Sequence, residues 1–212
     1  MQWRFYKSIK MKPIKAIAID AAFANMGLAR VEITSKGGVM SVTGQDLVLV
    51  STEREGHKQV RKSSDDLRRA GILVQGIKDF VGDATIAFAE VPSGSQSASA
   101  ARALGIAVGC LASCPVPVIE VSPMEVKKLF SPDGKRKVPK LEIIAWAMKQ
   151  WPALPWLKRA GKPTLANEHL ADALAIVMAG ISTPEFKRMI AIHHDVPNAH
   201  HNRPTLNRRS LY

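Results

Sequence analysis

Short apolar segments alternate with longer amphipathic ones through most of the chain, which predicts an α/β fold. Residues 14–20 are apolar except for Lys15 and a terminal Asp20, as in a strand that is buried on both faces of a sheet. Residues 28–33 alternate apolar and polar side chains, and residues 46–51 form a third short run. Turn residues separate these runs. The N-terminal part is therefore predicted to be an antiparallel meander whose first strand carries Asp20.

The later segments follow the periods of helices and strands in turn, and the pattern fades from residue 182. We therefore divide the chain into an N-terminal extension (1–13), one domain (14–181) and a basic, His-rich tail (182–212). The predicted elements are helices at 64–81, 97–112, 139–151 and 165–180, a short helix opening at Ser122-Pro123, and strands at 85–90 and 116–121.

Two of the predicted strands end on an acid. Asp20 closes the first strand, and Glu90 closes the strand at 85–90. Asp is unfavourable in strands, and functional side chains of α/β sheets gather at strand ends. The alternative is that each acid merely begins a turn or lies at an edge. Because the same pattern occurs twice, we favour a functional pair.

A second polar group lies on the last predicted helix. His169 and Asp172 are three residues apart, and Glu168 and Asp172 are four apart, so they are neighbours on the helix surface. Glu168 is also explained by the preference for acids at helix N-termini, and His169 by a polar position without a role. The preference for acids at helix N-termini explains Asp172 less well than Glu168, because Asp172 lies deeper in the helix beside apolar residues.

The charge balance favours a polyanionic partner. Lys and Arg number 30 against 18 Asp and Glu, a formal charge of +12. Nucleic acid is the first interpretation and an acidic membrane surface the second, with a merely basic protein as the alternative. Lys135, Arg136 and Lys137 form a cluster that is either a solvated face or a phosphate contact.

The tail is expected to be a mobile basic arm, although His-rich segments also bind metal; it contains His193, His194, His200, His201, Arg203, Arg208 and Arg209.

Cysteine usage and the absence of targeting segments indicate a cytoplasmic protein. Cys110 and Cys114 lie in one apolar stretch without the spacing of a zinc site, so we expect buried thiols in a reducing compartment. No apolar run has membrane-spanning length, and residues 1–10 lack the apolar segment of a secretory signal. Met11 is an alternative start of translation.

Asp20, Glu90, His169 and Asp172 form the candidate catalytic and metal-binding set. Three carboxylates and an imidazole that converge would repel one another unless a cation neutralised them. Oxygen-rich ligands favour Mg²⁺ or Mn²⁺ over zinc. Two such ions, roughly 3.5–4 Å apart, activate a water and stabilise the leaving oxygen of a phosphodiester. Nearby Lys and Arg would hold the nucleic-acid backbone.

The order of strand Asp, strand Glu and C-terminal helix acid resembles the RNase H-like, or retroviral-integrase, superfamily. Within it, three segments resemble the RuvC family of Holliday-junction resolvases: Glu90 to Gly105, Ser122 to Lys128, and His169-Leu-Ala-Asp-Ala-Leu-Ala175. The Gly134 to Lys137 stretch is similar to the family's Gly-rich, Lys-bearing continuation. The resemblance covers about residues 14–180, and its specificity comes from the order and spacing of the motifs.

This resemblance implies a three-layer RNase H-like fold with a mixed five-stranded sheet flanked by helices. It also implies a homodimer that nicks four-way DNA junctions symmetrically with Mg²⁺ or Mn²⁺. By position, Asp20, Glu90, His169 and Asp172 match the family's catalytic ligands. Lys127 and Lys137 match its basic residues near the scissile phosphate, and we add the adjacent Lys128, Lys135 and Arg136 as expected DNA contacts.

The chain departs from the family at two places. The family's first strand continues Asp-Pro-Gly or Asp-x-Gly, whereas here Ala21 and Ala22 follow Asp20. The family often has an aromatic residue just after its strand Glu, whereas Val91, Pro92 and Ser93 stand here. These departures suggest a diverged member, such as a viral one, and they bear on junction selectivity more than on nuclease chemistry.

Two other function classes were weighed. A catalytically silent nucleic-acid-binding module on the same fold would gain nothing from carboxylates that face phosphates. A sugar kinase or actin-like ATPase also opens with a strand Asp, but it needs Gly and Thr in the turn that follows, and Ala21 to Asn25 contains neither. We therefore expect a structure-selective, metal-dependent DNA endonuclease.

Overall fold

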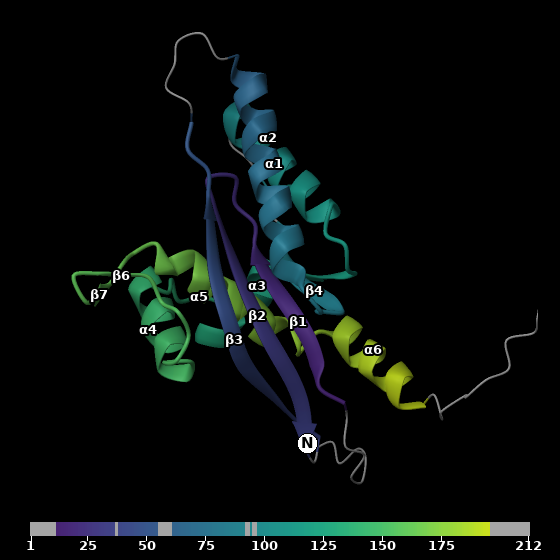
Figure 1. Cartoon of the computed structure of the whole chain (residues 1–212). Coiled ribbons are helices and arrows are strands. Elements are labelled where there is room, and N and C mark those ends of the chain that lie inside the picture. Colours follow the sequence, from purple (N-terminus) through teal and green to yellow (C-terminus); the bar gives the residue numbers. More distant parts are fainter. Residues whose placement is uncertain (1–11, 37, 55–60, 92–93, 95–96, 196–212) are drawn as a thin grey trace, which may run out of the picture.

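A mixed five-stranded sheet forms the centre of the protein (Figure 1). The computed structural model describes residues 12–36, 38–54, 61–91, 94 and 97–195. The sheet order is β3-β2-β1-β4-β5; β1 to β3 pair antiparallel, and β4 and β5 add parallel to β1. The strands are β1 (Ile14–Asp20), β2 (Asn25–Lys36), β3 (Val39–Ser51), β4 (Ile86–Glu90) and β5 (Val118–Val121).

Helices cover both faces of this sheet and make a three-layer α/β/α arrangement. One face packs against α1 (Lys62–Val81) and α2 (Ala98–Ala112), which lie side by side in Figure 1. The other face packs chiefly against α5 and buries a second apolar cluster. The helices on this second face are α3 (Pro123–Phe130), α4 (Lys140–Gln150), α5 (Asn167–Gly180) and α6 (Pro184–Asp195).

The period of two along the central strands decides which face each side chain meets. In β1, Ala16 and Ala18 belong to the cluster beneath α5, and Ile17 and Ile19 belong to the cluster beneath α1 and α2. Asp20 follows Ala16 and Ala18 in this alternation, so its side chain is directed to the α5 face of the sheet. The same alternation along β4, with Phe88 on the α5 side, directs Glu90 to that face as well.

Two positions without a side chain let α5 lie close to the sheet. A Cβ on Gly27 of β2 would overlap the backbone carbonyl of His169, and a Cβ on Gly180 would overlap the ring of Phe88. Gly27 is the register partner of Asp20 in the β1–β2 ladder. The close approach at Gly27 therefore places the start of α5 directly over the end of β1.

The structure confirms the predicted fold class and the five strands, with three differences in detail. β2 and β3 are longer than predicted, because they pair with each other along their whole length. The predicted loop at 151–161 leads into a small hairpin of β6 (Lys158–Arg159) and β7 (Lys162–Pro163). Helix α6 was not predicted; it lies beyond residue 181 and packs Phe186 against Phe88, with ring centroids 5.3 Å apart.

Several other predictions concern the cysteines, membrane-spanning segments and the two ends of the chain. Cys110 is buried and Cys114 half-buried; both are free thiols, and burial raises the pKa of each. No helix in the described part of the chain has the length and apolarity needed to cross a bilayer. The predictions for residues 1–11 and for the tail from residue 196 lie outside the described residues. The division of the chain at residue 181 stays a prediction.

Candidate active site

The acids at the ends of β1 and β4 lie side by side. Asp20 and Glu90 are register partners in the parallel β1–β4 ladder. Their strands are neighbours at the centre of the sheet, where the backbone is held by pairing on both edges. Burial raises the pKa of Glu90, and the nearby charge of Asp20 raises it further. The repeated strand-plus-acid pattern in the sequence thus corresponds to two adjacent carboxylates in space.

Helix α5 adds an imidazole and two further acids above this pair. Nδ1 of His169 lies 2.8 Å from Oδ2 of Asp20, and Nε2 of His169 lies 3.6 Å from Oε1 of Glu168. The side chains of Asp20, Glu168 and His169 are each about one-fifth exposed, so the group opens to solvent on one side. The hydrogen bond with Asp20 raises the pKa of His169, against the opposing effect of burial.

Asp172 is the most perturbed acid of the group. Its pKa is raised to about 7, first by burial and then by the charge of Asp20. Glu168 and Glu90 raise the pKa of Asp172 further, whereas His169 lowers it. Because the other four side chains all act on the pKa of Asp172, the four predicted residues and Glu168 form one electrostatic cluster. We call Asp20, Glu90, Glu168, His169 and Asp172 the acid cluster.

Lys140 is a cation beside this cluster that the sequence analysis did not single out. Its Nζ lies 2.6 Å from Oε2 of Glu168. That hydrogen bond raises the pKa of Lys140, and the charges of Asp172 and Asp20 act in the same direction. A signal was present in the sequence: Lys140 follows Pro139 at the first turn of a helix, where the helix dipole disfavours a cation. A lysine at that position needs a partner outside its own helix.

The turn after Asp20 is fixed by residues distant in the sequence. Arg69 of α1 is 4% exposed, and its guanidinium lies 3.9 Å from the centroid of the Phe23 ring. The Thr52 hydroxyl donates to the Phe23 carbonyl at 2.7 Å and accepts from Nε of Arg69 at 3.1 Å. These bonds replace the local rigidity that a Pro-Gly pair would give, so the Ala21-Ala22 departure does not leave the turn unsupported.

The five basic residues predicted to bind DNA are distributed around α3 and the loop that follows it. Lys127 is half-buried and near enough to Asp133 to help lower the pKa of that acid, after two hydrogen bonds to Asp133. Lys128, Lys135 and Lys137 are exposed. Arg136 is already engaged, because its guanidinium donates two hydrogen bonds to Glu142, at 2.8 and 2.7 Å. Of the cations on this side, Lys140 is the one paired with the acid cluster.

The donor set of the acid cluster suits a hard divalent cation. Within the described residues, no three His, Cys, Asp or Glu side chains already stand in the geometry of a metal site. Instead Asp20 is bonded to His169, and burial and repulsion favour the protonated forms of Glu90 and Asp172. The pKa values of these carboxylates are raised partly because their negative charges repel one another. A bound cation would remove that repulsion. The chemistry of these residues therefore fits Mg²⁺ or Mn²⁺.

Comparison with solved structures identifies the fold. The Thermus thermophilus RuvC structure in complex with a Holliday-junction substrate matches with a TM-score of 0.57 and 23% identity, covering 83% of this chain and 96% of that one. A second Thermus thermophilus RuvC structure matches with a TM-score of 0.55 at the same identity and coverage. The chain has the RuvC fold. No family model matches the sequence, and no curated protein matches it either.

The RuvC-like fold confirms the architecture that the sequence motifs implied. The match spans 96% of the RuvC chain, so the likeness concerns the fold as a whole and not one part of it. At 23% identity the likeness concerns fold alone. The roles of Asp20, Glu90, His169 and Asp172 rest on the geometry of the acid cluster.

Proposed function

We propose that the protein is a metal-dependent endonuclease that cleaves branched DNA and resolves four-way junctions. The observation that carries the proposal is the acid cluster, which lies at the ends of the two central strands and is open to solvent on one side. Its net negative charge would repel a phosphodiester unless cations neutralised it. A protein of net charge +12 that retains such a cluster is suited to bring phosphate and cation together.

The residues have separable roles in this proposal. Asp20, Glu90, His169 and Asp172 would hold Mg²⁺ or Mn²⁺, with two ions per site as the expected number. When bound, such ions supply an activated water and stabilise negative charge on the leaving oxygen. His169 is oriented by its bond to Asp20, and it must be neutral to bind a cation. Lys140, kept protonated by Glu168, is placed to neutralise a phosphate oxygen at the rim.

Selectivity for junctions and symmetric cleavage belong to the same proposal. Two opposed strands of a junction require two related active sites, which a homodimer of two-fold symmetry would supply. The candidate contact is the outer face of α2, where Ala98, Ala101 and Ala112 are exposed. Gly105 lies on the same helix and has open space around it. Sedimentation should show a dimer at micromolar concentration, and a monomer that still resolves junctions would remove the two-fold argument.

The deciding experiment is a cleavage assay on synthetic four-way, flap and linear duplex DNA, with and without Mg²⁺. We expect cleavage that requires the cation and is fastest on the four-way junction. An Asp20→Asn preparation, purified in parallel, controls for contaminating nucleases. Binding without cleavage under every metal tested would favour the catalytically silent nucleic-acid-binding module instead.

A further inference from the structure

The β6–β7 hairpin carries three positive charges that have no partner in the described part of the chain. Lys158, Arg159 and Lys162 are all exposed. Among the described residues, none forms a hydrogen bond or ion pair with these three side chains. Arg136 and Lys140, by contrast, are paired with Glu142 and Glu168. The hairpin is therefore a concentration of free positive charge, at the left edge of the molecule in Figure 1.

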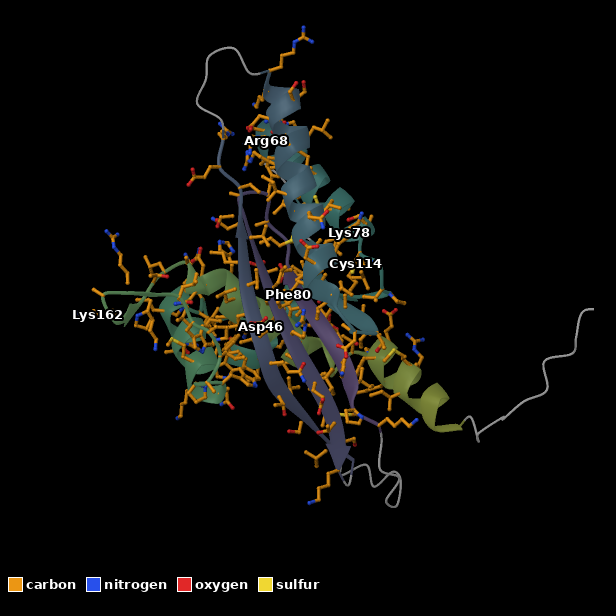
Figure 2. All side chains as sticks on the ribbon, in the orientation of Figure 1. Asp46, Arg68, Lys78, Phe80, Cys114 and Lys162 are labelled. Atoms are coloured by element: carbon orange, nitrogen blue, oxygen red, sulfur yellow. The ribbon has the colours of Figure 1, made fainter. Side chains whose placement is uncertain are left out.

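The backbone of the hairpin has one well-defined shape. Ala160 and Gly161 connect the two strands, with φ of 50° and 76°. Positive φ at both central residues is the mark of the tight two-residue turn that suits the twist of a hairpin. Ala and Gly place no large side chain at the tip, so the surface offered to a partner is formed by the three cations. Figure 2 shows Lys162 on the hairpin, at the left edge of the molecule.

A buried amide fastens the base of the hairpin to the helix of the acid cluster. Asn167, which is fully buried, accepts a hydrogen bond from the Leu157 N–H at 2.9 Å. Its amide N–H groups donate to the carbonyls of Leu157 and Thr164, at 2.8 and 3.0 Å. Leu157 and Thr164 flank the hairpin on its two sides, and Asn167 is the first residue of α5. The hairpin is thus held by the same helix that presents His169.

The length of the connection limits how far the cations lie from the acid cluster. Seven residues separate Lys162 from His169, so their Cα atoms are at most about 25 Å apart. The phosphates of one strand of duplex DNA advance about 3.4 Å per nucleotide, so this reach corresponds to no more than roughly seven nucleotides. A DNA arm that runs from the acid cluster toward the hairpin would therefore reach the three cations within about seven nucleotides.

We propose that the β6–β7 hairpin is a phosphate-backbone contact that holds one DNA arm beside the acid cluster. The inference rests on the proposed function and adds to it a binding element with a fixed position. Three exposed cations clustered on one hairpin suit the regular negative charge of a phosphate backbone. Contacts of this kind position DNA and carry no base preference.

The test compares two triple variants of the full chain. Lys158→Gln, Arg159→Gln and Lys162→Gln together remove the charge of the hairpin. Lys36→Gln, Lys78→Gln and Lys187→Gln together remove the same charge from exposed positions on β2, α1 and α6. Binding to a four-way junction is measured without divalent cation over a range of salt concentrations, and single-turnover cleavage is measured with Mg²⁺ at saturating DNA.

We expect the hairpin variant to bind at least about tenfold more weakly, with its log–log salt slope reduced by about 2–3, since each lost phosphate contact removes about 0.9. The control should change the slope by less than about 1. At saturating DNA the hairpin variant should cleave within about threefold of the wild-type rate, because the acid cluster is untouched. Equal melting temperatures for both variants and the wild type would show that folding is not the cause.

The outcomes separate this inference from the proposed function. If the two triple variants have the same affinity and slope while the wild type cleaves junctions, the hairpin proposal is wrong and the nuclease stands. If only the hairpin variant loses affinity but the wild type cleaves no DNA, the proposed contact surface is supported and the proposed nuclease activity is wrong. A wild type that does not bind DNA overturns both.

Discussion

The acid cluster and the surrounding cations differ in how closely their charges are held together. Asp20 and Glu90 end two paired central strands, and the helix that carries His169 and Asp172 packs directly on them. The predicted DNA contacts occupy α3 and the α3–α4 loop, and the proposed ones occupy the β6–β7 hairpin; Lys127 is half-buried and the others are exposed. In the acid cluster, a small displacement changes how strongly every charge acts on the others. Around it, exposed cations such as Lys128 and Lys162 form no hydrogen bond or ion pair with another described residue.

This difference implies that the two regions should fail differently when mutated. Removing one acid should abolish DNA cleavage but leave DNA binding intact, because the remaining groups of the cluster cannot replace the lost charge. Loss of one exposed cation should weaken binding by a limited amount and leave the chemical step unchanged. The predictions below test this separation, beginning with the largest expected effect.

Asp20→Asn should give the largest effect, a loss of cleavage of about 10³-fold or more, equivalent to about 4 kcal/mol in the barrier. Asp20 is the group whose charge acts on Glu90, His169 and Asp172 alike. Affinity for DNA should be unchanged or higher, because a negative charge beside the phosphates is removed. Single-turnover cleavage and a binding titration measure the two quantities separately. Asp79→Asn, on the exposed surface of α1, is the matched control and should behave as wild type.

His169→Ala should reduce cleavage by about 10²-fold, with partial recovery in excess Mn²⁺ by mass action. His169→Asp should retain substantial activity, because a carboxylate also binds a hard cation.

Wild-type activity should fall as pH drops and the imidazole of His169 becomes protonated. The hydrogen bond that protonated His169 donates to Asp20 moves this fall to higher pH than for a free histidine, and a bound cation opposes that shift. An Ala variant as active as wild type would make Glu168 the ligand to test.

Gly27→Ala should cost about 1–3 kcal/mol in the free energy of unfolding, because the new methyl overlaps the His169 carbonyl. Moving α5 away from β2 should also lengthen the His169–Asp20 contact and lower the cleavage rate. The control is Gly71→Ala on α1, where the new Cβ meets no atom within 4 Å, and it should stabilise by up to about 1 kcal/mol. Thermal unfolding and cleavage rates should separate the two variants. If Gly27→Ala is as active as wild type, the close approach does not position the imidazole.

The smallest predicted effect is a pH-dependent stabilisation by Mg²⁺. The folded-state pKa of Asp172 is raised to about 7, and those of Glu90 and His169 are also raised. Without a cation, the folded protein therefore binds protons that the unfolded chain releases, and stability falls as pH rises from about 4 to above 7. A cation offsets the repulsion that appears on deprotonation, so its effect should be larger at higher pH.

Melting temperatures with and without about 10 mM Mg²⁺ test this point. For a site with Kd of about 1 mM, binding adds roughly 1.4 kcal/mol, or about 3–5 °C. We expect this shift at about pH 8 and little of it at about pH 5, where the carboxylates compete with protons. The Asp20→Asn variant should show a smaller shift at both pH values. An equal shift for wild type and variant would place the cation elsewhere.

The sequence determined the elements and the chemical character of the site. Short apolar strands and amphipathic helices have periods of 2 and 3.6 that can be read directly, so the five strands and the helices between them up to residue 180 were predicted, but not the β6–β7 hairpin or α6. The repetition of a strand ending in an acid marked Asp20 and Glu90, and the spacing on α5 marked His169 and Asp172. These signals are local, because each depends on residues that are neighbours along the chain.

Only the tertiary structure decided which distant groups meet. The pairing of Lys140 with Glu168 spans two helices, and neither helix predicts it alone. The support of the turn after Asp20 comes from Thr52 and Arg69, which no spacing rule connects to Phe23. The β6–β7 hairpin is too short to show a period, and the bonds of a buried Asn167 fasten its base. Contacts of this kind depend on close packing between elements, which the periodicity of a single segment does not encode.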